Sequence, residues 1–357
     1  MDSHPATAAL RTATAITRMR HVRAIELAGA GAMELLDRLT TSRLFVREGQ
    51  MLHTLLLDEK ANVFADAFLC LDEEAWLLLC EGPSLDELLR HLEQVRHEIS
   101  SKAEISVTDL LADQVLWSVD GPYAWELCTA LLGPEVLGAP YLSFLRLSGI
   151  TCFRAGKTGE YGYLLLVPRA LADATWTRIW GLGKALGLAE ADVAALDQCA
   201  LENWHFSIRA LGERQWTGEL TPGELQLRWR VDGRKEFLGS EALRRRLSAG
   251  LVQRVTCFVA NAPVAPGQAI VLDQEHVGSV LHAGWSSTRG DWVGWALLDV
   301  AVASPGVDRF RVSAVDGPVP IRTHSPPLLD NRSLFVDPRK HRYSTRAGDD
   351  FPPLVRP

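Results

Sequence analysis

The sequence predicts an α+β fold that ends in a β-rich region. Between residues 22 and 186, apolar stripes at helical spacing alternate with short strand-like runs and hairpin turns. No G-x-G-x-x-G follows the first predicted strand, which argues against a doubly wound dinucleotide fold. Residues 251–319 combine short strands with many glycines and prolines, a pattern typical of a small β-barrel or sandwich. A chain of 357 residues suits two or three domains.

The first third of the chain begins with small and polar residues and continues with strands. Residues 1–16 lack periodicity and are predicted to be a loose lead-in. A helix is expected at 29–39, and Asp58 opens a natural hairpin turn. Strands are expected at residues 22–27, 50–57, 63–70 and 75–80.

A capping box starts the next helix, because Ser84 precedes Glu87 by three residues and an apolar stripe follows. Residues 323–357 are rich in proline and partly basic, so they are predicted to be a solvated tail on the surface. The remaining α+β part is expected to contain a strand at 115–119, strands within 142–168, and helices at 121–132, 170–186 and 191–203.

Composition narrows the function. The net charge of −7 argues against nucleic acid as the main partner. None of the six cysteines forms a C-x-x-C pair, which predicts reduced thiols in a cytoplasmic protein. No apolar run approaches the length of a membrane span, and no metal, nucleophile-elbow or P-loop motif is present. No nucleic acid, membrane or metal partner is therefore expected.

A glycine-rich segment at 154–163 separates two apolar runs and holds one carboxylate, Glu160, among three glycines. Glycines allow left-handed turns and close approach to a ligand. A turn that presents Glu160 at the end of a strand could bind a ligand with an amidine-like donor edge. An ordinary hairpin with a solvated acid explains this segment about equally well.

Two further acids lie in apolar surroundings. Asp66 sits inside the predicted strand 63–70, and Asp197 lies on the helix 191–203. A buried carboxylate is costly unless it has a partner or a task. For each acid taken alone, an outward-facing or salt-bridged position is the more common case.

Six ordered segments together resemble the aminomethyltransferase family, which comprises the glycine cleavage T-protein and its tetrahydrofolate-dependent relatives. The glycine-rich segment is similar to the family pattern R-x-G-Y-T-G-E-x-G, and residues 196–202 are similar to its R-D-x-x-R-L-E helix. The other matching segments lie at residues 36–60, 221–224, 237–243 and 278–287.

The resemblance implies a three-domain ring, the T-protein fold, with folate in a central channel. Two folate-binding α+β domains, possibly interleaved, would span residues 17–113 and 114–250. A C-terminal barrel would span 251–322, and the extended tail 323–357 would follow.

The resemblance also implies residue roles. By position, Asp66 matches the catalytic aspartate, which would assist proton transfer or stabilise developing positive charge at the folate nitrogens. Glu160 matches the carboxylate that holds the pterin, whose adjacent N–H and amino groups suit bidentate acceptance. Further cofactor-binding residues are expected to be Asp197, Arg154, Tyr161 and Trp285.

The chain departs from the family in several places. Leu196 and Ala200 stand where the helix normally has arginines, Lys157 replaces an aromatic residue, and His53 stands where relatives often have one. These changes indicate that the substrate side differs from that of the glycine cleavage enzyme, so a lipoyl carrier protein is a possible but not a favoured partner. The anionic glutamate end of folate is expected to meet Lys157, Arg154 or Arg228.

Two functions from different classes follow from the resemblance. The first is a tetrahydrofolate-dependent one-carbon transferase that moves a methyl, aminomethyl or formimidoyl-type group to or from a small substrate. The alternative is a non-catalytic folate-binding accessory protein of the iron–sulfur cluster assembly type. Those relatives carry a K-G-C-Y-x-G-Q-E signature that is missing around residues 218–224, and this chain keeps Asp66. The lost arginines also leave open a degenerate paralogue without either activity.

Overall fold

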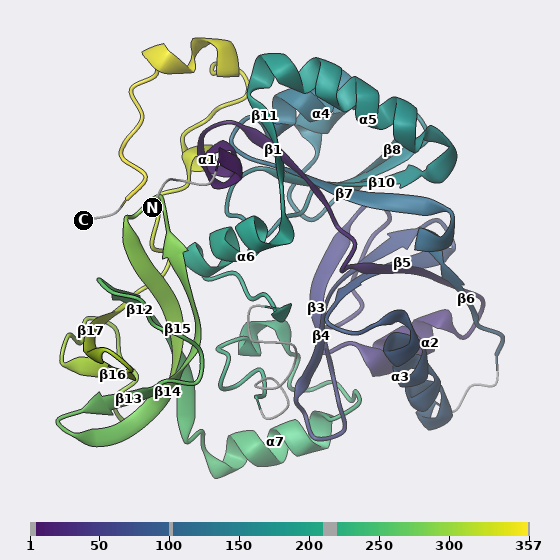
Figure 1. The fold of residues 1–357 in the computed structure, drawn as a ribbon. Coiled ribbons are helices and arrows are strands. Elements are labelled where there is room, and N and C mark those ends of the chain that lie inside the picture. Colours follow the sequence, from purple (N-terminus) through teal and green to yellow (C-terminus); the bar gives the residue numbers. More distant parts are fainter. Residues whose placement is uncertain (1–4, 100–102, 210–219, 356–357) are drawn as a thin grey trace.

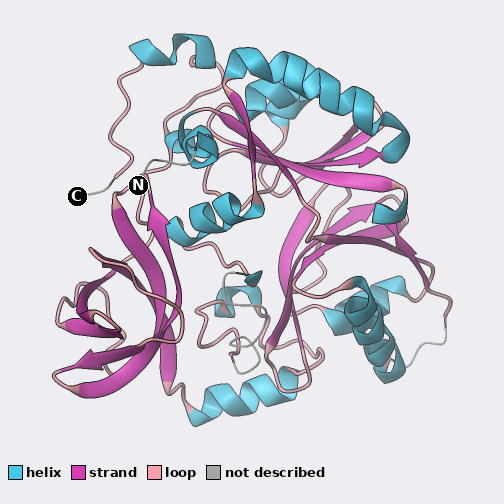
Figure 2. Cartoon of the chain, in the orientation of Figure 1, coloured by secondary structure: helices cyan, strands magenta, loops and turns pink. Residues whose placement is uncertain are grey.

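The computed structural model describes residues 5–99, 103–209 and 220–355. Two sheets with their covering helices and a separate barrel surround a central region that helix α6 enters (Figure 1). This three-part arrangement agrees with the predicted α+β ring. Helices, strands and connecting loops are distinguished in Figure 2. Within the described residues, no helix is long and apolar enough to cross a membrane.

The first sheet has five strands in the order β3-β4-β5-β2-β6. Helices α2 and α3 pack on it, and their buried leucines form one core with the strands. Ser84 caps α3 through the predicted capping box with Glu87. Asp58 makes the predicted hairpin turn by accepting hydrogen bonds from the backbone N–H groups of Lys60 and Asn62. The elements are β2 (Arg23–Ala28), α2 (Ala32–Leu39), β3 (Met51–Leu57), β4 (Val63–Asp72), β5 (Ala75–Glu81), α3 (Leu85–Glu98) and β6 (Ser106–Asp109).

The second sheet has six strands in the order β11-β1-β7-β10-β9-β8. Strand β1 precedes the whole first sheet in the chain and pairs in the second, so the two α+β parts are interleaved. The elements are β1 (Thr14–Arg18), β7 (Gln114–Asp120), α4 (Ala124–Leu132), β8 (Phe144–Leu147), β9 (Ile150–Phe153), β10 (Gly162–Pro168), α5 (Arg169–Gly183), β11 (Leu188–Ala191) and α6 (Val193–Glu202).

The expected loose lead-in at 1–16 is wrong beyond residue 4, where the described part begins. Helix α1 (Pro5–Thr12) and strand β1 follow directly, and Leu10 and Ile16 are fully buried. The helix buries mainly alanine methyl groups, so it lacks the large apolar stripe that reveals a helix in a sequence. Fully buried Arg11, which bonds to Glu202, ties this helix to α6.

The C-terminal region is a closed six-stranded barrel, which confirms the barrel and excludes the sandwich. Helix α7 leads into it. A core that includes Phe258 and Phe310 fills the barrel. Its elements are α7 (Ser240–Ala249), β12 (Gln253–Ala260), β13 (Ala269–Leu272), β14 (Glu275–Ser286), β15 (Asp291–Asp299), β16 (Phe310–Ala314) and β17 (Gly317–His324).

The tail that begins at residue 323 is not only a solvated surface extension. Leu328, Leu329 and Val336 are each no more than 3% exposed, and Asn331 is 8% exposed. Short 3₁₀ turns at Arg332–Leu334 and Tyr343–Gly348 shape it, and the tail returns past α1 and α4 (Figure 1). The sequence concealed this packing because the tail has no helical or strand period; single side chains and backbone groups anchor it.

Candidate functional site

A cavity lies between the two sheets and α6. Its walls come from the turn after β1, from β4, β5, β7 and β10, and from the glycine-rich loop. Its atom-free space is about 610 Å³ including the open mouth, but a water-sized sphere can centre in only about 40 Å³ of it. Apolar side chains such as Phe68 and Leu164 line much of the wall. Four carboxylates also line it: Asp66, Glu81, Asp120 and Asp197.

Asp66 projects into this cavity from β4 and is 2% exposed. Its Oδ1 lies 2.8 Å from His53 Nε2 and accepts a 2.8 Å hydrogen bond from Arg230, while Oδ2 lies 2.8 Å from Lys157 Nζ. Burial raises the pKa of Asp66, but Lys157, His53 and Arg230 together lower it by more. The pKa is therefore well below the usual value. Asp66 is therefore a carboxylate at neutral pH. Burial lowers the pKa of His53, so its ring is neutral and Nε2–H donates to Asp66.

Lys157 joins two carboxylates across the cavity. Asp66 and Glu81 face each other on the paired strands β4 and β5. Like charges in that register repel, and Lys157 Nζ lies between them, 2.8 Å from Asp66 and 2.9 Å from Glu81. Burial lowers the pKa of Lys157, but the two carboxylates raise it by more, so the side chain is an ammonium ion. Lys157, which stands where the family has an aromatic residue, thus supplies a cation whose side chain is 14% exposed.

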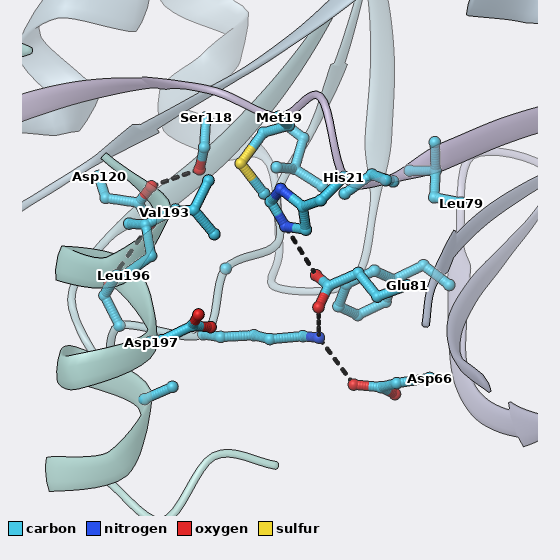
Figure 3. Close-up of a pocket in the computed structure, with 17 residues that line it drawn as sticks. Met19, His21, Asp66, Leu79, Glu81, Ser118, Asp120, Val193, Leu196 and Asp197 are labelled. Atoms are coloured by element: carbon cyan, nitrogen blue, oxygen red, sulfur yellow. Dashed lines mark hydrogen bonds and ion pairs between the residues drawn. The ribbon is translucent and has the colours of Figure 1, made fainter. Parts of the chain in front are cut away.

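Two other acids lie across the cavity from Asp66 and Glu81 (Figure 3). Asp120, at the end of β7, accepts hydrogen bonds from the hydroxyls of Ser118 and Thr158. Burial outweighs these bonds and raises the pKa of Asp120 to about 6. Asp197, on α6, accepts a 2.8 Å bond from Ser207, and burial raises its pKa as well. Arg209 Nε lies 3.5 Å from the other oxygen of Asp197. Neutral hydroxyls therefore hold Asp120, whereas one hydroxyl and one guanidinium hold Asp197.

Glu160 does not line this cavity. Its carboxylate accepts 3.1 Å and 2.7 Å hydrogen bonds from the backbone N–H groups of Arg332 and Ser333 in the tail, and a 2.6 Å bond from the Ser333 hydroxyl. Arg11 Nη1 lies 3.7 Å away. The expected convergence of Glu160 and Asp66 on one cavity is therefore not present. The reason is that the tail, whose packing the sequence did not reveal, supplies the paired donors that Glu160 accepts.

The other predicted contacts also lie away from the cavity lining. Arg154 stacks between the rings of Tyr161 and Tyr163, 4.8 Å from each centroid, and donates to the carbonyl of Gly162. The hydroxyl of Tyr161 donates to the carbonyl of Val336 in the tail. Trp285, on β14, packs edge-to-face against Trp292 in the barrel. Of the residues predicted to contact the cofactor or substrate, Asp66, Lys157 and Asp197 all line the cavity.

Several polar residues at the cavity were missed in the sequence. Glu81 directly follows the predicted strand 75–80 and ends the observed β5, and the hairpin register that places it opposite Asp66 was an available signal. His21 approaches Glu81 at 4.0 Å, and burial lowers the pKa of His21 to about 4. Arg230 comes from a 3₁₀ turn far along the chain, and no local pattern connects it with Asp66.

Known protein families match the two α+β parts as one domain and the barrel as another. The GCVT N-terminal domain matches residues 4–235, and the glycine cleavage T-protein C-terminal barrel domain matches residues 253–330. The chain belongs to the glycine cleavage T-protein family. The match from residue 4 shows that most of the predicted lead-in at residues 1–16 is part of the family domain.

Curated relatives and a solved structure agree with this assignment. An aminomethyltransferase from Frankia alni is 28% identical over 332 residues, which cover 90% of this chain and 87% of that protein. A probable aminomethyltransferase from Thermococcus kodakarensis is 24% identical, with 93% and 89% covered. The fold is similar to that of the glycine cleavage system aminomethyltransferase T from Bartonella henselae, with a TM-score of 0.78, 20% identity, and 91% and 89% of the two chains covered.

Proposed function

We propose that this protein is a tetrahydrofolate-dependent one-carbon transferase that acts on a small substrate. The observation that carries the proposal is the buried Asp66, which projects into a cavity at the meeting point of both α+β sheets. Family membership and relatives named aminomethyltransferase over most of the chain support it. A reduced folate would supply the nitrogens that carry the one-carbon unit.

The cavity residues fit a flat heterocycle with a donor edge. Phe68, Leu164 and Leu196 give apolar walls, which suit ring faces. Asp197 can accept a pterin N–H and amino group in the role first expected of Glu160, because it lines the cavity and its side chain is 21% exposed. A pterin would take the place of Arg209, whose Nε lies 3.5 Å from Asp197 Oδ2, and would share Oδ1 with the Ser207 hydroxyl. His21 Nδ1 is buried and has no hydrogen-bond partner among the described residues, so a bound ligand can satisfy it. The narrow interior requires the side chains to part when such a ring enters.

Asp66 acts electrostatically in this proposal. Its lowered pKa keeps it ionised at neutral pH, so it is a poor proton donor and a weak base. A fixed carboxylate in a water-poor site stabilises positive charge that develops beside it. Lys157 and a positively charged substrate group would compete for Asp66 Oδ2. When the substrate displaces the Lys157 ammonium from Asp66, its contact with Glu81 still holds it.

The substrate side lacks the arginines that the resemblance leads one to expect. Leu196 and Ala200 line the cavity, so this stretch of α6 offers no cation to an anionic substrate. Lys157 of the glycine-rich loop is instead a cation that lines the cavity. These features favour a specialised small substrate over a lipoyl group carried by a protein partner.

Calorimetric titration with tetrahydrofolate tests the assignment. Wild-type protein should bind in the micromolar range, and Asp197→Asn should weaken binding by about tenfold, because a bidentate charge-assisted pair would be lost. Glu160→Gln is the matched control with the same loss of charge and should bind as wild type does. Equal binding by wild type and Asp197→Asn, with weaker binding by Glu160→Gln, would restore Glu160 as the pterin anchor. No binding to wild type would refute the proposed function.

The accessory alternative has one structural observation in its favour. Lys157, Arg230 and His53 already hold Asp66, so its carboxylate is not free for chemistry in this conformation. Turnover separates the two functions. A transferase consumes a one-carbon donor in step with folate, and Asp66→Asn abolishes that consumption. An accessory protein binds folate without any such consumption.

A further inference from the structure

A second pocket lies beside the cavity and is lined by four arginines. Arg18, Arg20, Arg23 and Arg169 line it, together with residues of β7, and no acidic residue contributes to the lining. A water-sized sphere can centre in about 380 Å³ of this pocket, compared with about 40 Å³ in the cavity. The pocket is therefore roomy, open and strongly positive, although the chain as a whole carries a net charge of −7.

Most of this positive charge has no carboxylate partner among the described residues. Arg169 donates only to the carbonyls of Leu111 and Ala112, and Arg23 donates only to the carbonyl of Arg20. Arg23 Nε is buried without a hydrogen-bond partner in the described part of the chain. Arg18 differs, because it pairs with Glu190 at 3.2 Å. A buried guanidinium N–H with no acceptor is costly and indicates that an acceptor from outside the chain belongs there.

The pocket and the cavity are neighbours along β7. Ser118 lines the cavity, and Leu116, two residues earlier on the same face of the strand, lines the pocket together with Val115 and Trp117 of the other face. Met19 lines both spaces, and its backbone N–H donates to the carbonyl of Leu116. Only this flexible thioether side chain is common to the two linings. Methionine adapts its shape readily, so one ligand can pass beside it.

We propose that the arginine pocket binds a chain of carboxylates, namely the oligo-γ-glutamyl tail of a folate whose ring system occupies the cavity. The inference rests on the proposed function. Several carboxylates spaced along one flexible chain match several guanidinium groups spread around a roomy pocket, and Arg–carboxylate pairs can be bidentate. This site differs from the one first expected for the glutamate end. Of the residues named there, Lys157 is paired inside the cavity and Arg154 is stacked between tyrosines.

Calorimetry with tetrahydrofolate that carries one or three glutamates tests the inference. In wild-type protein the triglutamate should bind about tenfold more tightly than the monoglutamate, and the advantage should fall in high salt. In Arg20→Gln/Arg23→Gln the advantage should disappear while monoglutamate affinity stays unchanged. Arg90→Gln/Arg96→Gln on α3, with the same change of charge on exposed residues, is the matched control and should keep the advantage. Thermal melts check that both variants are folded.

The outcomes separate this inference from the proposed function. Equal binding of monoglutamate and triglutamate to wild type overturns the tail site and leaves folate binding intact. Failure of both to bind refutes the proposed function and the tail site with it. If tri-γ-glutamate alone, or citrate, binds the arginines as tightly as the folate triglutamate binds, the pocket takes a free polyanion and the tail assignment is wrong.

Discussion

Asp66 and Glu160 are both buried carboxylates, yet their surroundings differ in kind. Asp66 is held by the cations Lys157 and Arg230 and by neutral His53, and its pKa is lowered. Glu160 is held mainly by neutral N–H and O–H groups of the tail, with Arg11 at 3.7 Å, and burial raises its pKa.

This difference separates the places that the two acids occupy in the folded chain. Compensating charge fixes Asp66 in its ionised form at the wall of the cavity. Glu160 instead accepts hydrogen bonds from two adjacent N–H groups of the tail, as a carboxylate can from a ligand with two adjacent donors. One acid belongs to the cavity, and the other is a docking point for the chain's own C-terminal segment.

Removing the charge of Asp66 should have the largest effect on stability. Asp66→Asn leaves Lys157 and Arg230 buried with less compensation, and breaking one partner of a buried ion pair costs about 3–5 kcal/mol. Urea unfolding measures the loss. Asp173→Asn, an exposed acid on α5, is the control and should change stability by less than about 0.5 kcal/mol. A cost for Asp66→Asn as small as that of the control would mean that the cluster is not mutually compensating.

The pH dependence of stability distinguishes acids held by cations from acids held by neutral donors. Asp120 belongs to the second kind, with a folded pKa of about 6 against an ordinary value of 3.8. The native state therefore binds more protons than the unfolded state between these values, and the free energy of unfolding falls as pH rises from about 4 to 6, by about 2–3 kcal/mol. Asp66 has the opposite sign, because its contribution is lost only as pH falls below about 4.

Urea unfolding at pH 4, 5, 6 and 7 checks this for wild type and Asp120→Asn. The variant should show a shallower decline in stability between pH 4 and 6, because it cannot titrate at position 120. Some decline should persist, since burial also raises the pKa values of Glu160 and Asp197. Parallel pH profiles for the two proteins would contradict the elevated pKa of Asp120.

The same comparison explains which parts of the molecule the sequence could predict. Asp66 interrupts a strongly apolar strand, so its burial and need for partners were visible from its neighbours. The hairpins, the capping box at Ser84 and the C-terminal barrel also rest on local patterns. The partner of Glu160 lies 172 to 173 residues away in an aperiodic tail, and Arg230 lies 164 residues from Asp66. Contacts between residues so far apart in the sequence arise from tertiary packing, and no local period or turn signal predicts them.

The smallest expected effect concerns a single hydroxyl in the tail, and it tests whether Glu160 is a docking point. Ser333 Oγ donates to Glu160 and also accepts a 2.8 Å bond from the backbone N–H of Tyr161. Ser333→Ala removes both bonds but leaves the backbone donors, so it should cost about 1–2 kcal/mol. Ser344→Ala, an exposed serine of the same tail, is the control and should cost almost nothing.

Because the lost bonds hold the tail and not the cavity, the effect of Ser333→Ala should be local. Trypsin should cut the tail faster in this variant than in wild type or Ser344→Ala, since cleavage at the tail's arginines tracks the population of the open tail. Affinity for tetrahydrofolate should stay unchanged. Weaker folate binding without faster cleavage would show that the Glu160 region serves the ligand, and the contrast between the two acids would then disappear.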